Sequence, residues 1–178
     1  RQNVIFHGNQ SINDLETRIK AKSQSQKFKI FKSDFTDLSQ VDNFMNNAIN
    51  YLNGLDILVN NAGTMVGRYQ LETISEKDFL KIFDLNAKSA YFATKSACTI
   101  FKKQNYGNII NVSTISARTG GSAGSSVYAA SKAFVSGITR SLVSELSPYN
   151  IRINAISPGT ITTKFHAVSY THLTLPTT

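Results

Sequence analysis

Cysteine is almost absent from this chain of 178 residues, in which Cys98 is the single example. One thiol cannot form a disulfide within the chain, which suits a cytoplasmic location. The three histidines, His7, His166 and His172, lie far apart in sequence with no cysteine near them, so we expect no metal site. No apolar run approaches the ~20 residues that a membrane-spanning helix needs, and no secretory signal pattern opens the sequence. We therefore expect a cytoplasmic globular protein without a membrane partner.

Acidic residues are also scarce, because 11 Asp and Glu stand against 19 Lys and Arg and give a formal net charge of +8. Such an excess raises the question of a nucleic-acid partner. The bases are scattered, however, apart from a group near one predicted helix-to-strand junction: Lys20, Lys22, Lys27, Lys29 and Lys32. The sequence contains neither an arginine-rich run nor interleaved aromatic and basic residues. We interpret the charge as a solvated basic face and expect no nucleic-acid partner.

Short β-rich runs alternate with helical patterns along the chain. Strands are predicted at 3–7, 28–31, 55–59, 108–112 and 151–156. Helices are predicted at 11–22, around 41–52, over 75–103 with a break near 85–86, and over 125–147. This alternation predicts an α/β fold with a doubly wound parallel sheet and helices on both faces. No repeat or linker divides the chain, so we expect one domain.

Polar residues gather where the predicted strands end. They are Asp34 after the second strand, Asn-Asn-Ala-Gly at 60–63 after the third, Ser113-Thr114 after the fourth and Pro158-Gly159-Thr160 after the fifth. Ligands of open parallel sheets bind at the carboxyl ends of the strands. The sequence therefore places all of these groups along one candidate ligand-binding edge.

Tyr128 and Lys132 are spaced by one helical turn near the start of the predicted helix 125–147, so they project from the same face. A free tyrosine has a pKa of roughly 10 and exchanges protons poorly at neutral pH. A nearby ammonium group favours the phenolate and is expected to lower that pKa. The pair, with a strand-end hydroxyl opposite, outlines a proton-transfer site.

The chain carries a set of residues in this order: Asp34, residues 60–63, Asn86, the hydroxyl pair Ser113-Thr114, Tyr128 with Lys132, and Pro158-Gly159. This ordered set resembles the short-chain dehydrogenase/reductase (SDR) family, in its compact single-domain branch. The resemblance covers about residues 3–166. It implies a Rossmann-like fold, but the family's glycine-rich phosphate loop is not found and would precede Arg1. We therefore expect a fragment, with a partial NAD(P)-binding domain over 1–167 forming an incomplete three-layer α/β/α sandwich. Residues 168–178 carry no acid, lysine or arginine and are interpreted as a non-native tail.

The resemblance also implies catalytic roles. Tyr128 is expected to act as general acid or base, and Lys132 to lower its pKa and contact the nicotinamide ribose. Asn86 is expected to hold a water that relays protons to Lys132; without the family it would be interpreted as a helix kink or cap. Thr114 stands where the family has a substrate-steadying serine, and Ser113 and Ser116 are the alternatives.

Cofactor contacts are implied in the same way. Asn60, Ala62 and Gly63 would border the adenine ribose, although Asn60 and Asn61 could chiefly brace neighbouring strands. Asp34 would meet the adenine or, alternatively, cap the following helix. Four further residues would lie along the nicotinamide and pyrophosphate: Pro158, Gly159, Ile161 and Thr163. The first strand ends in the neutral residues His7 to Ser11, which favours NADP over NAD because a carboxylate there would select NAD.

The resemblance implies an NAD(P)-dependent oxidoreductase that interconverts a carbonyl and an alcohol on a small-molecule substrate whose identity the sequence does not reveal. A nucleotide-sugar epimerase or dehydratase shares the Tyr-Lys pair, and a dinucleotide-binding protein without turnover is the non-enzymatic alternative. Family members pair through two long helices, here about 86–103 and 125–147. A homo-oligomer is therefore expected, with four candidate contact residues that could equally belong to the core: Tyr91, Phe92, Phe134 and Leu142.

Overall fold

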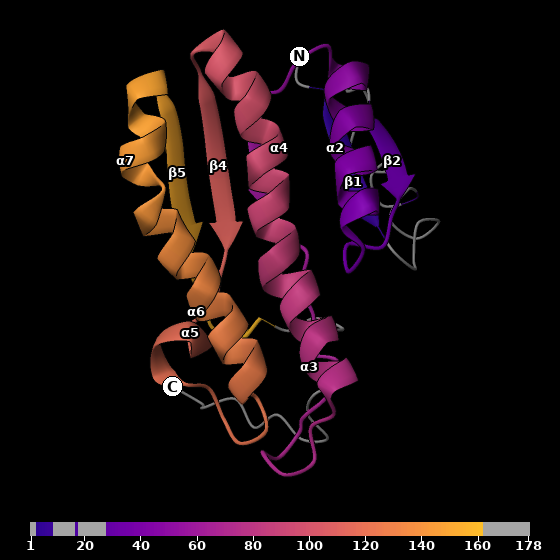
Figure 1. Cartoon of the computed structure of the whole chain (residues 1–178), viewed down its shortest axis with the longest axis vertical. Helices are drawn as coiled ribbons and strands as arrows, with labels where there is room; N and C mark the ends of the chain where they lie inside the picture. The colour runs from indigo at the N-terminus through magenta and orange to yellow at the C-terminus, as the bar shows by residue number, and fades with distance from the viewer. Residues whose placement is uncertain (1–2, 9–16, 18–27, 162–178) are drawn as a thin grey trace.

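The computed structural model describes residues 3–8, 17 and 28–161 (Figure 1). Its strands are β1 (Val4–Gly8), β2 (Phe28–Lys32), β3 (Ile57–Asn60), β4 (Gly107–Val112) and β5 (Ile151–Ile156). Its long helices are α2 (Leu38–Leu52), α3 (Glu76–Phe83), α4 (Ser89–Gln104) and α6 (Ser126–Ser141), and the shorter ones are η1 (Asp84–Lys88), α5 (Ser116–Thr119), α7 (Val143–Leu146) and η2 (Ser147–Tyr149). The predicted helix 11–22, Thr163 and the segment 168–178 lie outside the described residues, apart from Thr17.

All strand pairs are parallel, as the alternation of strands and helices predicted. Hydrogen bonds join β1 to β2, from Val4↔Phe28 to Gly8↔Lys32, in one sheet. A second sheet has the order β3-β4-β5, and β4 is its central strand. Among the described residues, β1 and β3 therefore each lie at an edge of their sheet.

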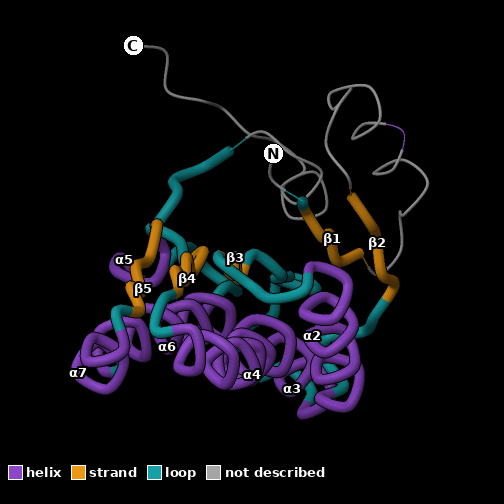
Figure 2. The backbone as a smooth tube through the Cα atoms, turned by 90° about the horizontal axis from the view of Figure 1, so that it is seen from above, coloured by secondary structure: helices purple, strands orange, loops and turns teal. Residues whose placement is uncertain are grey.

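The helices of the described part cover one side of the strands. Figure 2 shows α2, α4, α6 and α7 together below the two sheets. The predicted second helical layer does not occur among the described residues. On the uncovered side Ile57, Val59 and Ile156 are exposed although they lie on strands.

The main core lies between α4 and the strands that it packs against. Phe101 of α4 is fully buried, together with Val41 and Met45 of α2 and Ile109 of β4. At Gly107 a Cβ atom would overlap the ring of Phe101. A glycine is thus required where β4 begins beneath this helix.

The predicted break in the 75–103 helix is confirmed, and it is a π-helical segment. Ser75 caps α3 because its hydroxyl accepts from Asp78 N at 3.1 Å. The chain then passes through η1, which contains Asn86, before α4 begins. π-Helical turns occur frequently at functional sites. The predicted helix 125–147 is also divided, into α6, α7 and the 3₁₀ turn η2.

Candidate active site

The carboxyl ends of β3, β4 and β5 and the first turns of α6 enclose a cavity of about 370 Å³. Ligand sites of small molecules commonly have volumes of this order. Its lining includes Gly63, Thr114, Tyr128, Lys132 and Pro158. The structure therefore brings together residues that lie almost one hundred positions apart in sequence, as the strand-end argument predicted for β3, β4 and β5. Asp34, Asn60 and Ala62, which the same argument placed along this edge, are not among the residues that line the cavity.

Tyr128 is buried, and its hydroxyl is hydrogen-bonded to the side chain of Thr114. Burial raises the pKa of Tyr128, and the hydrogen bond to Thr114 opposes that rise only in part. The sequence predicted a lowered pKa, and that prediction is wrong for this structure, because desolvation of the phenolate outweighs the stabilising contact. Tyr128 is therefore held as the neutral phenol, which is the acid form.

The two alternatives to Thr114 lie differently. Ser113 Oγ donates to Lys132 O at 3.0 Å and lies 2.7 Å from Ser136 Oγ, so it faces α6. Ser116 lies two residues after Thr114, at the start of α5, and its N–H donates to Thr114 Oγ1 at 3.3 Å. Thr114 is thus the one of these three hydroxyls for which a contact with the Tyr128 side chain is observed.

Lys132 is buried, and its ammonium group is directed at the end of β4. Nζ donates to Val112 O at 2.9 Å. Burial lowers the pKa of Lys132 to about 8, since the desolvated cation is disfavoured. At pH 7 most of the side chain remains charged, so a cation stands one helical turn from the phenol.

Asn86 is fully buried, and its amide bonds to the loop that follows β3. Oδ1 accepts from Thr64 N at 2.8 Å, and Nδ2 donates to Thr64 O at 2.7 Å. The Asn86 side chain thus bonds to both the N–H and the C=O of Thr64, and these two bonds hold the loop against η1. An Asn amide still has one donor and one acceptor position beyond these two bonds.

Gly63 lies close to both Asn86 and Lys132. A Cβ at Gly63 would lie 2.8 Å from Asn86 Oδ1 and 3.0 Å from Lys132 Nζ. The sequence analysis placed this glycine beside the adenine ribose. In the structure its close neighbours are these two side chains, so any larger residue would displace the ammonium group.

Asn60 belongs to a buried polar network beneath the site. Its Nδ2 donates to Asn111 Oδ1 at 2.8 Å and to Thr94 Oγ1 at 3.0 Å. Asn111, fully buried on β4, donates in turn to Thr139 Oγ1 of α6 at 2.9 Å. The network ties β3, β4, α4 and α6 together, which is the bracing role considered for Asn60. Asn111 was not singled out from the sequence, although one amide inside the apolar run 109–112 was the available signal.

Asp34 orders the turn after β2. Its Oδ1 accepts from Thr36 N at 3.0 Å and from Thr36 Oγ1 at 2.8 Å. The residue that caps α2 is Asp37, which accepts from Ser39 N at 2.9 Å. The alternative in which Asp34 caps that helix is therefore wrong.

The remaining predicted cofactor residues follow the carboxyl ends of β3 and β5. Ala62 is half-buried against the core. Pro158 O accepts from Ile115 N at 2.9 Å. Pro158, Gly159 and Ile161 line the cavity, and a Cβ at Gly159 would meet no atom within 4 Å. The cavity is therefore open on this side.

Arg68 also lines the cavity, and the sequence analysis did not single it out. A lone arginine in the loop directly after residues 60–63 was the available signal. Its Nη1 donates to Ser122 Oγ at 2.9 Å and to Ala123 O at 2.8 Å. Arg68 thus joins the loop after β3 to the loop before α6.

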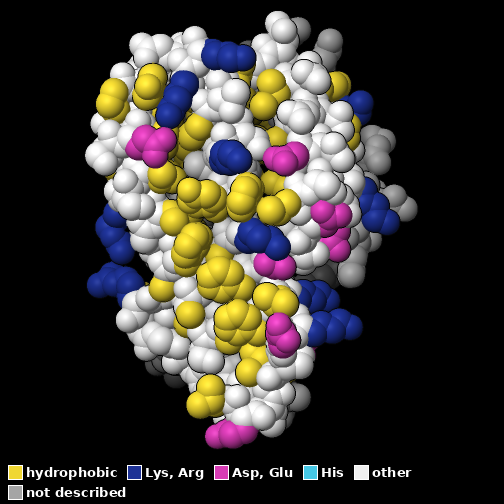
Figure 3. All heavy atoms as spheres, in the orientation of Figure 1, with side chains coloured by type: hydrophobic (Ala, Val, Ile, Leu, Met, Phe, Trp, Pro, Cys, Tyr) yellow, Lys and Arg dark blue, Asp and Glu magenta, His cyan; other side chains and the backbone are white. Residues whose placement is uncertain are grey.

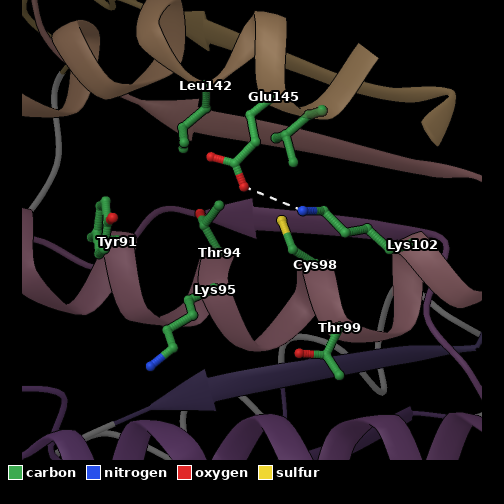
Figure 4. Close-up of a pocket in the computed structure, with 9 residues that line it drawn as sticks. Tyr91, Thr94, Lys95, Cys98, Thr99, Lys102, Leu142 and Glu145 are labelled. Atoms are coloured by element: carbon green, nitrogen blue, oxygen red, sulfur yellow. Dashed lines mark hydrogen bonds and ion pairs between the residues drawn. The ribbon is translucent and has the colours of Figure 1, made fainter. Parts of the chain in front are cut away.

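A second cavity, of about 220 Å³, lies between α4 and α7, away from Tyr128 (Figure 4). Cys98 faces it, and burial raises the pKa of this thiol, which disfavours the reactive thiolate. Lys102 Nζ and Glu145 Oε1 form an ion pair at 3.2 Å across it.

The described residues contain no cluster of three His, Cys, Asp or Glu side chains suited to a metal ion. No helix among them is both long and apolar enough to cross a membrane.

Comparison with known proteins gives a family. The model of the short chain dehydrogenase family matches residues 2–173. The chain is 36% identical over 149 residues to 2-dehydro-3-deoxy-D-gluconate 5-dehydrogenase of Dickeya dadantii (strain 3937), with 83% of this chain and 58% of that protein covered. It is 33% identical over 152 residues to hydroxynaphthalene reductase-like protein Arp2 of Metarhizium acridum (strain CQMa 102), with 85% and 55% covered.

The chain therefore spans between half and two thirds of the length of these relatives. Among solved structures, NADH-dependent reductase A1-R′ complexed with NAD has a TM-score of 0.79 at 30% sequence identity, with 90% of this chain and 68% of that chain covered. This likeness confirms the predicted Rossmann-like fold. On this sequence and structural evidence, the protein is a member of the short-chain dehydrogenase family.

Proposed function

We propose that the protein is an NAD(P)-dependent oxidoreductase that transfers a hydride between a nicotinamide and a carbonyl or alcohol substrate. The observation that carries the proposal is the placement of Thr114, Tyr128 and Lys132 around one cavity at the strand ends. The names of the relatives, a reductase-like protein and a dehydrogenase, point to the same reaction class.

Tyr128 supplies the proton in this proposal. In reduction the carbonyl carbon gains a hydride while the carbonyl oxygen takes the phenolic proton; in oxidation the same oxygen returns it. Tyr128 is protonated at neutral pH and therefore carries the proton that it donates. Its raised pKa makes it a weaker acid than free tyrosine, so the transfer depends on the cation of Lys132 to stabilise the phenolate. Thr114, already bonded to the phenol, steadies the substrate oxygen with its own hydroxyl.

Lys132 and Asn86 restore the proton. The buried ammonium group stabilises the phenolate left after transfer, since a cation near the phenolate favours the charged form. Its pKa of about 8 lets it pass a proton on without a large energetic step. A water held by Asn86 would connect Lys132 to solvent, using the amide positions that Thr64 does not occupy.

The nicotinamide half of a dinucleotide fits the residues present. The open side of the cavity at Gly159 would leave room for a flat ring, with Pro158 and Ile161 as apolar neighbours, and Lys132 would hold a ribose hydroxyl. When bound, the nicotinamide supplies or accepts the hydride. Toward the adenine we assign Asp34, Asn60, Ala62 and Gly63, with Asn60 acting from the backbone because its amide braces the network. We keep Thr163 in the set on the family resemblance alone.

Our preference for NADP over NAD rests on the neutral end of β1. Of the residues there, His7 has its ring occupied by contacts with Ser33 and Phe35. The NADH dependence of the A1-R′ reductase supports the opposite choice. The ratio of kcat/KM for NADPH to that for NADH decides between them.

The decisive experiment compares Tyr128→Phe with the unaltered protein, in its natural full length, on a panel of ketones with NADPH and NADH. Loss of the phenolic proton should lower the reduction rate by about 10²–10⁴-fold, with the Kd of the cofactor unchanged. Tyr106→Phe is the matched control, because Tyr106 is exposed and precedes β4 at the opposite end of the strand. Tight cofactor binding without turnover on any ketone or alcohol would favour the non-catalytic binder instead.

We further propose that the protein pairs with a second copy through the face formed by α4 and α6. Hydrophobic side chains form a band across the face of the molecule drawn in Figure 3. Tyr91 of α4 and Phe134 of α6 are exposed, and their ring centroids lie 6.4 Å apart. Phe92 and Leu142 are half-buried. Phe134→Lys should shift the sedimentation coefficient toward that of a monomer; an unchanged coefficient would count against this interface.

A cytoplasmic location, suggested by the lone thiol, is testable with a fluorescent fusion.

A further inference from the structure

Met65 forms an apolar part of the cavity wall, in the loop that follows β3. Its side chain is 7% exposed and lines the cavity that contains Tyr128. It also belongs to a buried apolar cluster with Ile82 of α3 and with Tyr128 itself. Of these three residues, Met65 and Tyr128 line the cavity and Ile82 does not. Met65 therefore lies between the packed cluster and the space beside the phenol.

The order of the strands places Met65 away from the residues assigned to the nicotinamide. β4 is the central strand of its sheet, and β3 and β5 lie on its two sides. Met65 follows β3, whereas Pro158 and Ile161 follow β5. A nicotinamide ring beside Pro158 and Ile161 would therefore lie on one side of the β4 end, with Met65 on the other.

Hydrogen bonds fix the backbone directly before Met65. Thr64 N and Thr64 O both bond to the Asn86 side chain, at 2.8 and 2.7 Å. Thr64 Oγ1 also accepts from Val66 N at 3.0 Å. Since Asn86 is fully buried in η1, the segment that carries Met65 is fastened to a buried helical turn.

The residue after Met65 is conformationally strained. Gly67 N donates to Met65 O at 2.7 Å, which closes a three-residue turn with Val66 at its centre. Val66 has a φ of +60°, and a β-branched residue rarely adopts this left-handed region. Such strain persists only where the surrounding structure over-determines it, and it clusters at active sites and ligand clamps. The turn thus holds Met65 at the cavity wall from its carboxyl side.

We propose that Met65 determines substrate specificity, because it limits the size of the group that a carbonyl substrate can place beside the Tyr128 phenol. The side chain cannot withdraw from the cavity without leaving a void in the cluster that it shares with Ile82. Ketones with a methyl group on one side of the carbonyl are accepted, and ketones with branched groups on both sides are excluded. This inference rests on the proposed function and specifies the shape of its substrate.

The test measures kcat/KM for isopropyl methyl ketone and for diisopropyl ketone with the natural full-length protein. Diisopropyl ketone places a branched group beside Met65 in either orientation, so the unaltered enzyme should prefer the methyl ketone. Met65→Ala should raise the ratio of kcat/KM for diisopropyl ketone to that for isopropyl methyl ketone by about 10- to 100-fold, because it makes room for the additional carbon atoms. Met65→Phe should lower this ratio. Met65→Leu, which nearly conserves volume, should change it little.

Ile82→Ala is the matched control. It removes as many heavy atoms as Met65→Ala from the same cluster, but from a residue that does not line the cavity. It should lower kcat/KM for both ketones by a similar factor and leave the ratio unchanged. Ile82→Val gives the same comparison with a smaller loss of packing if Ile82→Ala does not fold. An equal rise of the ratio in Met65→Ala and in the Ile82 variant would overturn the proposal, since packing of the cluster would then control the size limit.

Two further results would overturn the proposal. The unaltered enzyme could reduce both ketones equally well, or the ratio could stay the same in Met65→Ala and Met65→Phe. Either result leaves the oxidoreductase standing, because the ketones are still reduced, and it removes the role of Met65.

A binding measurement separates this inference from the proposed function. Saturation-transfer difference NMR on the cofactor-loaded protein gives the Kd of each ketone without requiring turnover. Diisopropyl ketone should bind more tightly to Met65→Ala than to the unaltered protein, and this gain should be absent from Ile82→Val. That result supports the size limit even if no ketone is reduced. Equal affinities of the unaltered protein and Met65→Ala for diisopropyl ketone would overturn it, with or without turnover.

Discussion

The sheets β3-β4-β5 and β1-β2 share parallel geometry but differ in how deeply their strands are buried. β4 has a partner on each side and contains the fully buried residues Ile109 and Asn111. Every residue of β1 is only half-buried. A parallel strand is most stable when both faces and both edges are covered. The proposed catalytic residues lie beside the buried strand β4, either directly after it or on α6 and η1. His7 and Asp34, near the proposed adenine end, lie on or directly after strands of the two-stranded sheet.

The residues proposed for proton transfer and those proposed for cofactor selection therefore lie near strands that are buried to different degrees. Thr114 follows the central strand, and Tyr128 and Lys132 lie on a helix packed across it. Their relative positions are set by the packing of α6 against β4 and β5 and by the buried hydrogen bond from Asn111 to Thr139. The site at the end of β1 depends instead on one aromatic cluster, in which Phe35 and Phe44 surround His7.

The largest expected effect on the free energy of unfolding comes from the core beside β4. Phe101→Ala should destabilise the protein by about 3–5 kcal/mol, because a fully buried aromatic ring leaves a cavity above Gly107. Phe31→Ala, in the half-buried strand β2, should cost less. Urea denaturation followed by circular dichroism measures both. Equal losses would remove the contrast between the two sheets.

An intermediate effect concerns the polar network within the same sheet. Asn111→Leu should cost about 1–3 kcal/mol, because Thr139 and Asn60 each lose a buried partner. Adding Thr139→Val should recover part of that loss, since it removes the hydroxyl oxygen that no longer accepts from Asn111. The recovery is only partial because the same hydroxyl donates to Val135 O at 2.7 Å. A double-mutant cycle on the free energy of unfolding gives the coupling. Strict additivity would show that the network contributes little.

The smallest effect belongs to the two-stranded sheet. Burial lowers the pKa of His7 below its ordinary value of 6.5, against the opposing influences of Ser33 and Asp34. Between these two pKa values the unfolded chain binds more protons, so this contribution to stability is complete above about pH 6.5 and decreases on acidification. The unfolding midpoint should therefore fall between about pH 7.5 and pH 5 more in the unaltered protein than in His7→Phe. Parallel profiles would show that His7 does not titrate in this window.

Much of the site was predictable because it follows from strand ends and helical spacing. Asn86 shows the limit of that approach. Its position at a helix break was predicted from the sequence, but its pairing with Thr64 depends on a loop from another part of the chain. The pKa of Tyr128 shows the same limit, because spacing indicated a nearby cation and could not indicate that burial would outweigh it.

By itself the sequence determined the order of strands and helices, the edge at which the polar residues meet and the pairing of Tyr128 with Lys132 on one helical face. These features follow from periodicities that act over a few residues. Only the tertiary structure decided which hydroxyl meets Tyr128, where the ammonium group of Lys132 is directed, and that Arg68 shares their cavity. Burial and contacts between distant segments set these properties, and neither is encoded in local spacing.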